Sequence, residues 1–186
     1  MLITRFSSIG DVVLTTPVLR CLKEQRRDVE VHFLTRVFFR ELLSANPYVH
    51  TIHTFKYNLK EVIQDLKAEK FDYIIDLHKN LRSYKLKALL RRPSFTFDKL
   101  NLRKFLYVHF KVGSLPNVHI VDRYLKSLRA LGVKNDGKGL DYFIPDDQQV
   151  NIRSFPHEFQ QGYVVWVIGA KHFTKRFPDH KVREVI

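Results

Sequence analysis

Residues 2–17 read LITRFSSIGDVVLTTP, and this stretch decides how the rest of the chain folds. It predicts a short apolar strand, a small polar turn and then a helix. Ser7, Ser8 and Gly10 supply the turn, because serine oxygens cap helices and glycine adopts backbone angles that other residues avoid. Asp11 falls in the first helical turn, where free N–H groups and the helix dipole favour a negative charge. Doubly wound α/β domains place ligands at such a junction, although a helix-capping role alone also accounts for Asp11.

The chain that follows alternates apolar strands with amphipathic helices. Pro17 lies inside the pattern of a helix over about 10–26, so we expect a kink or a tight early turn there. Residues 71–77 form a continuous apolar run of the kind that is buried in parallel sheets. Further strands are expected at 29–34, 49–55 and 94–97, and helices at 37–43, 59–68, 101–110 and 118–131. One more helix is expected to follow residues 78–83 and to end at about residue 90. This alternation predicts an α/β fold with a mostly parallel sheet and flanking helices.

The last fifty residues have a different character. Residues 142–145 are strand-like, residues 146–159 are polar and suggest a linker, and residues 162–168 predict a new buried strand. The helix expected after that strand is cut off at the end of the sequence. The pattern therefore predicts a first domain over 1–158 and the truncated start of a second domain over 159–186.

Composition limits the kinds of partner. The formal net charge is +13 in 186 residues, which favours nucleic acid, a membrane surface or a phosphorylated substrate. Between Lys79 and Lys104 nine basic residues face the single acid Asp98. The sequence has neither a signal peptide nor an apolar run of about 18 residues. A lone cysteine, Cys21, reads as a buried thiol, so we expect a reducing, cytoplasmic location.

Four stretches, in this order, resemble the family 9 glycosyltransferases, the ADP-heptose:lipopolysaccharide heptosyltransferases. They are Arg5 to Leu14 with Thr16-Pro17, Phe71 to Leu77 followed by Asn80 to Ser83, His119 to Tyr124, and Gly169-Ala170 with Lys175 to Pro178. The sequence departs from the family at Ile168, which is usually Pro, and at Phe177, which is usually Trp. The four stretches are spread over nearly the whole chain, from Arg5 to Pro178.

The resemblance implies a GT-B architecture, in which two Rossmann-like domains face each other across a cleft. This chain would be the N-terminal, acceptor-binding half with the start of the donor half. The implied activity of the parent protein is inverting transfer of a heptose from ADP-heptose, or a related nucleotide sugar, to the inner core of lipopolysaccharide. The fragment alone is expected to be inactive. The resemblance implies no catalytic metal and no cofactor.

The resemblance also places chemistry on individual residues. Asp11 would be the general base on the acceptor hydroxyl, and Lys175 would stabilise the departing diphosphate. Acceptor-binding residues would be Ser8, Gly10, Lys79, Arg82 and Arg123. The nucleotide sugar would lie against Gly169, Ala170, Thr174 and Lys175, where small residues let backbone N–H groups approach phosphates. For each lysine and arginine, a solvated surface position remains the alternative.

A second hypothesis is a basic nucleic-acid-binding α/β protein. Aromatic residues alternate with lysine and arginine along 84–107, as in proteins that stack bases, but no helix-turn-helix, zinc or RNA-recognition signature is present. An anionic lipid acceptor explains the charge equally well. We also expect the basic aromatic segment 102–111 to rest on an anionic membrane at the inner face of the inner membrane. His78, His119 and His172 lack metal-ligand spacing, so no metal site is predicted.

Overall fold

The computed structural model describes residues 1–112, 116–165, 167, 169–170 and 172–184 of the chain. It divides into two compact units, Met1–Pro145 and Asp146–Ile186, each of which is described by itself. None of the helices in these described residues is long and apolar enough to cross a lipid bilayer.

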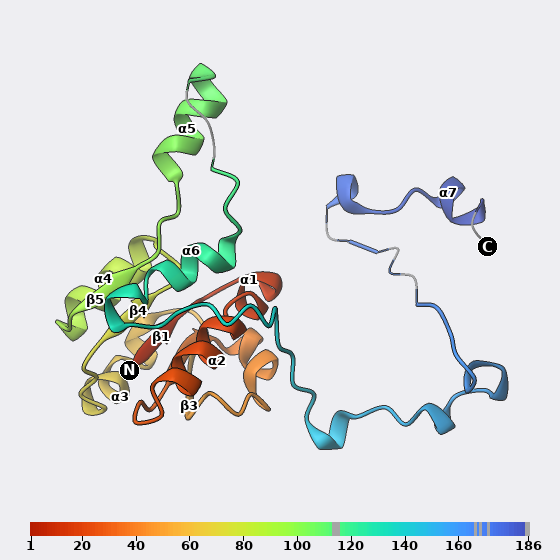
Figure 1. The fold of residues 1–186 in the computed structure, drawn as a ribbon, viewed down its shortest axis with the longest axis horizontal. Coiled ribbons are helices and arrows are strands. Elements are labelled where there is room, and N and C mark those ends of the chain that lie inside the picture. The colour runs from red at the N-terminus through yellow and green to blue at the C-terminus, as the bar shows by residue number, and fades with distance from the viewer. Residues whose placement is uncertain (113–115, 166, 168, 171, 185–186) are drawn as a thin grey trace. The chain divides into compact units, whose positions relative to one another are not determined.

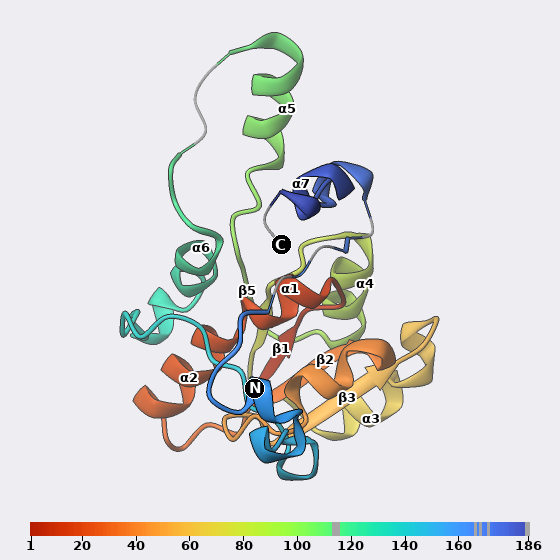
Figure 2. The same ribbon diagram turned by 90° about the vertical axis from the view of Figure 1, so that its right-hand side faces the viewer.

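The first unit is built on a five-stranded sheet in the order β3-β2-β1-β4-β5, with every neighbouring pair parallel (Figure 1). The strands β1, β2 and β3 follow one another across the sheet in Figure 2. The bounds are β1 (Leu2–Thr4), β2 (His32–Arg36), β3 (Thr51–Phe55), β4 (Ile74–Asp76) and β5 (Ser94–Thr96). The predicted parallel α/β sheet is thus confirmed. The order reverses direction between β1 and β4, and in such sheets ligands bind beyond the carboxyl ends of the strands at that point.

The connections between the strands are helical. The α-helices of this unit are α1 (Ile9–Val13), α2 (Thr16–Gln25), α3 (Ile63–Ala68), α4 (Leu81–Leu90), α5 (Asn101–Phe110) and α6 (Ile120–Lys126). Short 3-10 helices occupy Val37–Leu43, Leu59–Glu61 and Arg129–Leu131. The helix expected over 10–26 is divided by a turn at residues 14–15 into α1 and α2, which agrees with a tight early turn and not with a kink. Pro17 lies in the first turn of α2, where its missing N–H is not needed.

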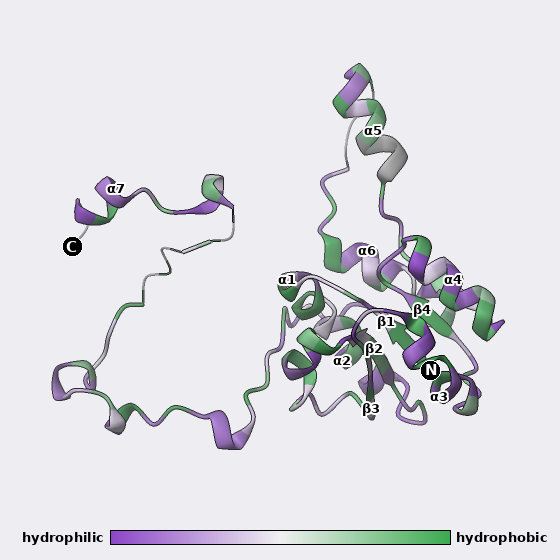
Figure 3. Ribbon diagram, turned by 180° about the vertical axis from the view of Figure 1, so that it is seen from behind, coloured by the Kyte–Doolittle hydropathy of each residue, from purple (hydrophilic) through white to green (hydrophobic). Residues whose placement is uncertain are grey.

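Two apolar cores lie on opposite faces of the sheet. Successive strand residues point to opposite sides, so Ile3 joins one core and Leu2 the other. The first core includes side chains of α2 and α6, and the second includes side chains of α3 and α4. Figure 3 shows β1 and β4 in the colour of hydrophobic residues, as expected for strands buried on both faces.

One buried arginine holds the segment after α6 against α2. Arg20 is 2% exposed, and its Nε and Nη2 donate to the two carboxylate oxygens of Asp136 at 2.7 and 2.9 Å. Its Nη1 pairs with Asp141, and Nη2 also donates to the Gly139 carbonyl at 2.9 Å. The strand expected at 142–145 is absent, because these residues pair with no strand of the sheet.

The second unit consists of short helical turns joined by extended chain. They are the 3-10 helices Asp146–Gln148, Ile152–Ser154, His157–Phe159 and Phe173–Lys175, and the helix α7 (Asp179–Arg183). The buried strand expected over 162–168 is wrong for the described residues of that range, since Val164 is 92% exposed and Val167 81% exposed. A strand needs a hydrogen-bonded neighbour, and the described part of this unit offers none.

Replacing Arg20 by Met should lower the free energy of unfolding by about 3 kcal/mol, because two partly buried carboxylates lose their shared cation. Hydrogen bonding to Arg20 also lowers the pKa of Asp136 below its ordinary value of 3.8. The pair of Arg20 and Asp136 therefore contributes its full share of the free energy of unfolding above about pH 4, and this share is lost as the pH falls further. Urea unfolding at pH 7 and at lower pH measures both effects.

The matched control is Arg27→Met, which removes an exposed arginine just beyond the same helix. It should leave the free energy of unfolding within about 0.5 kcal/mol of the wild type. Equal stability of the Arg20 and Arg27 variants would contradict the anchoring role of Arg20.

Candidate functional site

The centre of the candidate site is Arg5, which directly follows β1. Its side chain is 9% exposed and every arm has a partner. Nε donates to the Ser7 carbonyl at 2.7 Å and Nη1 to the Leu77 carbonyl at 2.6 Å, while Nη2 lies 2.6 Å from Asp11 Oδ2. One guanidinium thus joins the turn after β1, the chain just after β4 and the first turn of α1. This role was not predicted from the sequence, where Arg5 is marked only as a charged residue directly after an apolar strand.

Asp11 is held in place but remains partly open to solvent, with a side chain 37% exposed. Its Oδ2 accepts hydrogen bonds from the backbone N–H of Ser8 at 3.2 Å and from the Ser8 hydroxyl at 3.0 Å. Partial burial raises the pKa of Asp11, but the Ser8 hydrogen bonds and the Arg5 charge outweigh it and hold the pKa below its ordinary value. Gly10 beside it is exposed, and a Cβ built there meets no atom within 4 Å. The site therefore presents an ionised carboxylate beside open space.

Two further polar side chains lie beside this cluster, and neither was predicted from the sequence to act in it. Tyr124, in α6, is fully buried with its ring 5.9 Å from the Arg5 guanidinium carbon, and burial raises its pKa to about 12. The His78 ring packs against Phe6 at 4.8 Å. Burial, followed by the charges of Arg5 and Lys99, lowers the pKa of His78 to about 4. Both side chains are therefore neutral at pH 7.

The loop after β4 is organised by a buried carboxylate, Asp76, which is 0% exposed. It accepts hydrogen bonds from the backbone N–H groups of His78 and Lys79 at 3.0 and 2.9 Å, and from the Ser83 hydroxyl at 2.8 Å. Lys87 Nζ completes the set at 3.2 Å. Asp76 therefore fixes the loop that carries His78 and Lys79 toward the Arg5 cluster.

The structure brings two of the three basic acceptor candidates together. Lys79 Nζ lies 4.0 Å from the Asp98 carboxylate, and Arg123 Nη1 donates to the Asp98 carbonyl at 3.3 Å. Arg82 is exposed and has a different neighbour, since its guanidinium carbon lies 5.4 Å from the centre of the Phe55 ring. Lys79 and Arg123 thus meet at Asp98, whereas Arg82 lies against Phe55.

The candidates for nucleotide-sugar binding all lie in the second unit. Gly169 is exposed and Ala170 is half-buried, while Thr174 and Lys175 are exposed on the 3-10 helix Phe173–Lys175. Arg176 Nε donates to the Ala170 carbonyl at 2.8 Å, which closes the loop between them. Lys171 of this loop lies outside the described residues. The roles of these four residues remain predictions.

Comparison with known proteins finds sequence similarity to heptosyltransferases. No family model matches it. It is 28% identical over 132 residues to lipopolysaccharide heptosyltransferase 1 of Campylobacter coli, covering 66% of this chain and 39% of that protein. It is 29% identical over 144 residues to lipopolysaccharide heptosyltransferase 3 of Escherichia coli K12, covering 67% and 40%. The chain thus spans about two fifths of the length of these curated relatives.

Solved structures show the same fold. A glycosyltransferase of family 9 from Veillonella parvula superposes with a TM-score of 0.72 at 23% identity, over 99% of this chain and 58% of that one. The E. coli heptosyltransferase WaaC with ADP superposes with a TM-score of 0.69 at 21% identity, over 99% and 61%. The chain is therefore heptosyltransferase-like in sequence, and its fold is that of a fragment of these enzymes. The resemblance read from its motifs is confirmed.

We expect His78 to titrate with a pKa of about 4, which NMR of its ring protons against pH measures directly. Because this value lies below the 6.5 of an ordinary histidine, the unfolded chain takes up the proton first. Folding stability attributable to His78 is therefore complete above about pH 6.5 and falls as the pH drops toward 4. A midpoint near 6.5 would contradict the half-buried position of the ring and its exposure to the charges of Arg5 and Lys99.

Proposed function

We propose that this heptosyltransferase-like chain forms the acceptor-binding part of an inverting glycosyltransferase, which moves a heptose from ADP-heptose to the lipopolysaccharide inner core. The observation that carries the proposal is Asp11, a half-open ionised carboxylate at the carboxyl edge of the sheet, where the strand order reverses. The relatives named above support the acceptor and the transferred sugar. WaaC was also solved with ADP-2-deoxy-2-fluoro heptose, which supports an ADP-linked donor.

In this mechanism Asp11 acts as general base. It takes the proton of an acceptor hydroxyl while that oxygen attacks the anomeric carbon of the donor. The bond between that carbon and the diphosphate oxygen breaks on the opposite face, so configuration inverts and ADP leaves. The pairing with Arg5 keeps Asp11 ionised but weakens it as a base. Exclusion of water from the closed site would restore part of its basicity.

The remaining predicted residues fit the two substrates. Ser8 and Gly10 border the open space at Asp11, and Lys79 and Arg123 supply positive charge for the anionic groups of the acceptor. For the donor, Gly169, Ala170 and Thr174 would border the phosphates, and Lys175 would stabilise the leaving diphosphate. The donor domain in this proposal begins near residue 159.

No specific observation on the described residues favours the alternative of a nucleic-acid-binding protein. Lys79 pairs with the Asp98 carboxylate and Arg123 donates to the Asp98 carbonyl, so both of these basic side chains already have partners within the chain. Sequence-selective binding to DNA or RNA that survives moderate salt would favour this alternative over the transferase.

Asp11→Asn should reduce heptosyl transfer about 10²- to 10⁴-fold, because the amide cannot accept the hydroxyl proton. The assay uses the longest natural form of the protein containing this chain, with ADP-heptose and a truncated lipopolysaccharide acceptor. Asparagine keeps the helix-capping geometry, so circular dichroism should remain that of the wild type.

The matched control is Asp65→Asn, which removes an exposed carboxylate on α3. It should transfer heptose at the wild-type rate. Full activity of the Asp11 variant would mean that Asp11 is not the general base and serves only as a helix cap. Absence of transfer by the wild type with every nucleotide sugar tried would overturn the proposed reaction.

We also propose that α5 rests on an anionic membrane on the cytoplasmic side, where the lipid acceptor is presented. The described side chains of this helix are exposed despite being apolar, with Phe105 at 51%, Val108 at 60% and Phe110 at 62%. Basic residues accompany them in the sequence at Arg103, Lys104 and Lys111. Aromatic and basic residues together are typical of helices that lie in a membrane interface.

The double substitution Phe105→Ser with Phe110→Ser should weaken sedimentation with phosphatidylglycerol vesicles about tenfold or more, since two apolar rings no longer enter the interface. Phe38→Ser is the matched control, because Phe38 is 74% exposed outside α5. Equal binding to neutral and anionic vesicles by the wild type would contradict the proposal.

A further inference from the structure

Two buried histidines meet across neighbouring strands near the amino ends of β2 and β3. His32 opens β2, and His53 lies opposite Leu34 two residues further along, so the two rings share one face of the sheet. They are 5% and 8% exposed, and His32 Nδ1 lies 3.0 Å from His53 Nε2. The ring centroids are 5.2 Å apart with an interplanar angle of only 14°. The two nitrogens therefore face each other nearly within the ring planes, which is the direction of their lone pairs.

A carboxylate completes a group of three possible ligands. The ligand atoms of His32, His53 and Glu69 all lie within 4.8 Å of one another. Glu69 is the exposed residue that follows α3, so it reaches the pair from a third element. His32 and Glu69 also line a pocket of about 400 Å³, which gives an ion a route from solvent. Buried imidazoles, a carboxylate and an entry route are the features expected of a metal site.

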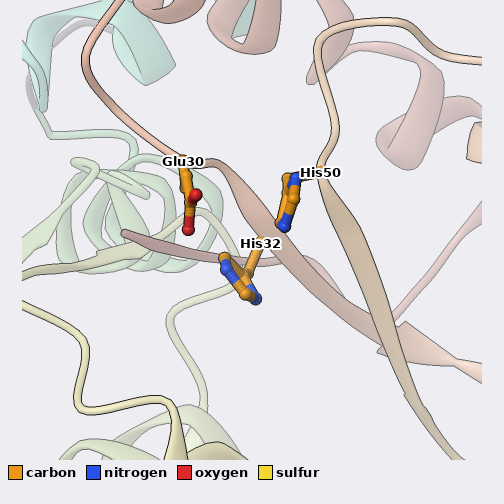
Figure 4. A group of neighbouring side chains, drawn as sticks. All are labelled: Glu30, His32 and His50. Atoms are coloured by element: carbon orange, nitrogen blue, oxygen red, sulfur yellow. The ribbon is translucent and has the colours of Figure 1, made fainter.

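A second group shares His32. Figure 4 shows Glu30 and His50 flanking the His32 ring, and the ligand atoms of these three side chains also lie within 4.8 Å of one another. Glu30 and His50 are both exposed, whereas His53 is buried beside His32. Exposed side chains lose more conformational freedom when they bind an ion. The set that contains the buried pair is therefore the better organised of the two.

We propose that His32, His53 and Glu69 bind a divalent transition-metal ion of the zinc class. Imidazole nitrogen and carboxylate oxygen suit such ions, and two histidines with one glutamate leave a fourth position for water. Tetrahedral zinc holds two imidazole nitrogens about 3.3 Å apart, close to the 3.0 Å separation observed. For both facing nitrogens to bind the ion, the ring that donates in this pair takes its N–H proton on its other nitrogen instead, so both imidazoles stay neutral.

The surroundings favour uncharged imidazoles. Burial lowers the pKa of both His32 and His53, so neither ring carries a proton charge at pH 7. Glu69 supplies the nearest negative charge to both rings, with Asp65 also acting on His53, whereas the Met1 amino group and His50 act on His32 with positive charge. The ion would join β2, β3 and the end of α3. The histidines weighed in the sequence analysis were others, and this site is separate from the proposed transfer reaction.

The test titrates the chelator-treated chain with ZnCl₂ by calorimetry and follows thermal unfolding. We expect one ion per chain and an unfolding midpoint raised by about 5 to 10 °C at a free zinc concentration one hundred times Kd. Co²⁺ used in place of zinc should give visible absorption bands of a low-symmetry site. Absence of stoichiometric binding, or no shift of the midpoint, would overturn the proposal.

Variants decide which side chains bind the ion. Glu69→Gln changes an exposed residue, so this variant should fold normally, and it should bind zinc at least tenfold more weakly. His53→Gln should also bind zinc at least tenfold more weakly. Glu30→Gln and His50→Gln are matched controls and should keep the wild-type affinity. Loss of binding in these two variants, with Glu69→Gln unaffected, would overturn the proposed ligand set.

Discussion

The carboxyl edge of the sheet depends on one buried cation, the guanidinium of Arg5. An unpaired guanidinium is too costly to bury, so its three partners must be in place together. These are the Ser7 carbonyl in the turn after β1, the Leu77 carbonyl after β4 and the Asp11 carboxylate in α1. The position of Asp11 is consequently set by a residue on the neighbouring strand end as well as by its own helix. The ion pair with Arg5 both orients the Asp11 carboxylate and reduces its basicity.

A buried anion at the adjacent strand end complements this cation. Asp76 ends β4 as Thr4 ends β1, and the two residues are partners in the parallel register. Through its four hydrogen-bonding and ionic partners, Asp76 shapes the loop from which His78 and Lys79 extend. The point where the strand order reverses is therefore braced by two oppositely charged side chains that draw on different partners. Such bracing lets the half-exposed carboxylate of Asp11 meet a ligand without loosening the sheet.

Local pattern predicted the sheet and its helices well, because periodicity and turn residues act over a few positions. The lengths of elements depended on distant partners. The run 71–77 forms a strand of only three residues, Ile74–Asp76, since its central neighbour β1 is equally short. The apolar runs at 142–145 and in the described part of 162–168 lack a pairing strand altogether. The role of Arg5 could not be read locally either, because one of its acceptors lies 72 residues away.

The Arg20 anchor has a consequence for the order in which the chain acquires structure during synthesis. Its partner Asp141 follows 121 residues later, and Asp136 follows 116 residues later. At roughly 5 to 20 residues per second, a ribosome adds that length in roughly 6 to 24 seconds. Throughout that interval the Arg20 guanidinium on α2 lacks its carboxylate partners, because Asp136 and Asp141 have not yet been synthesised. The apolar face of α2 therefore cannot close fully over the sheet until nearly all of the first unit has been translated.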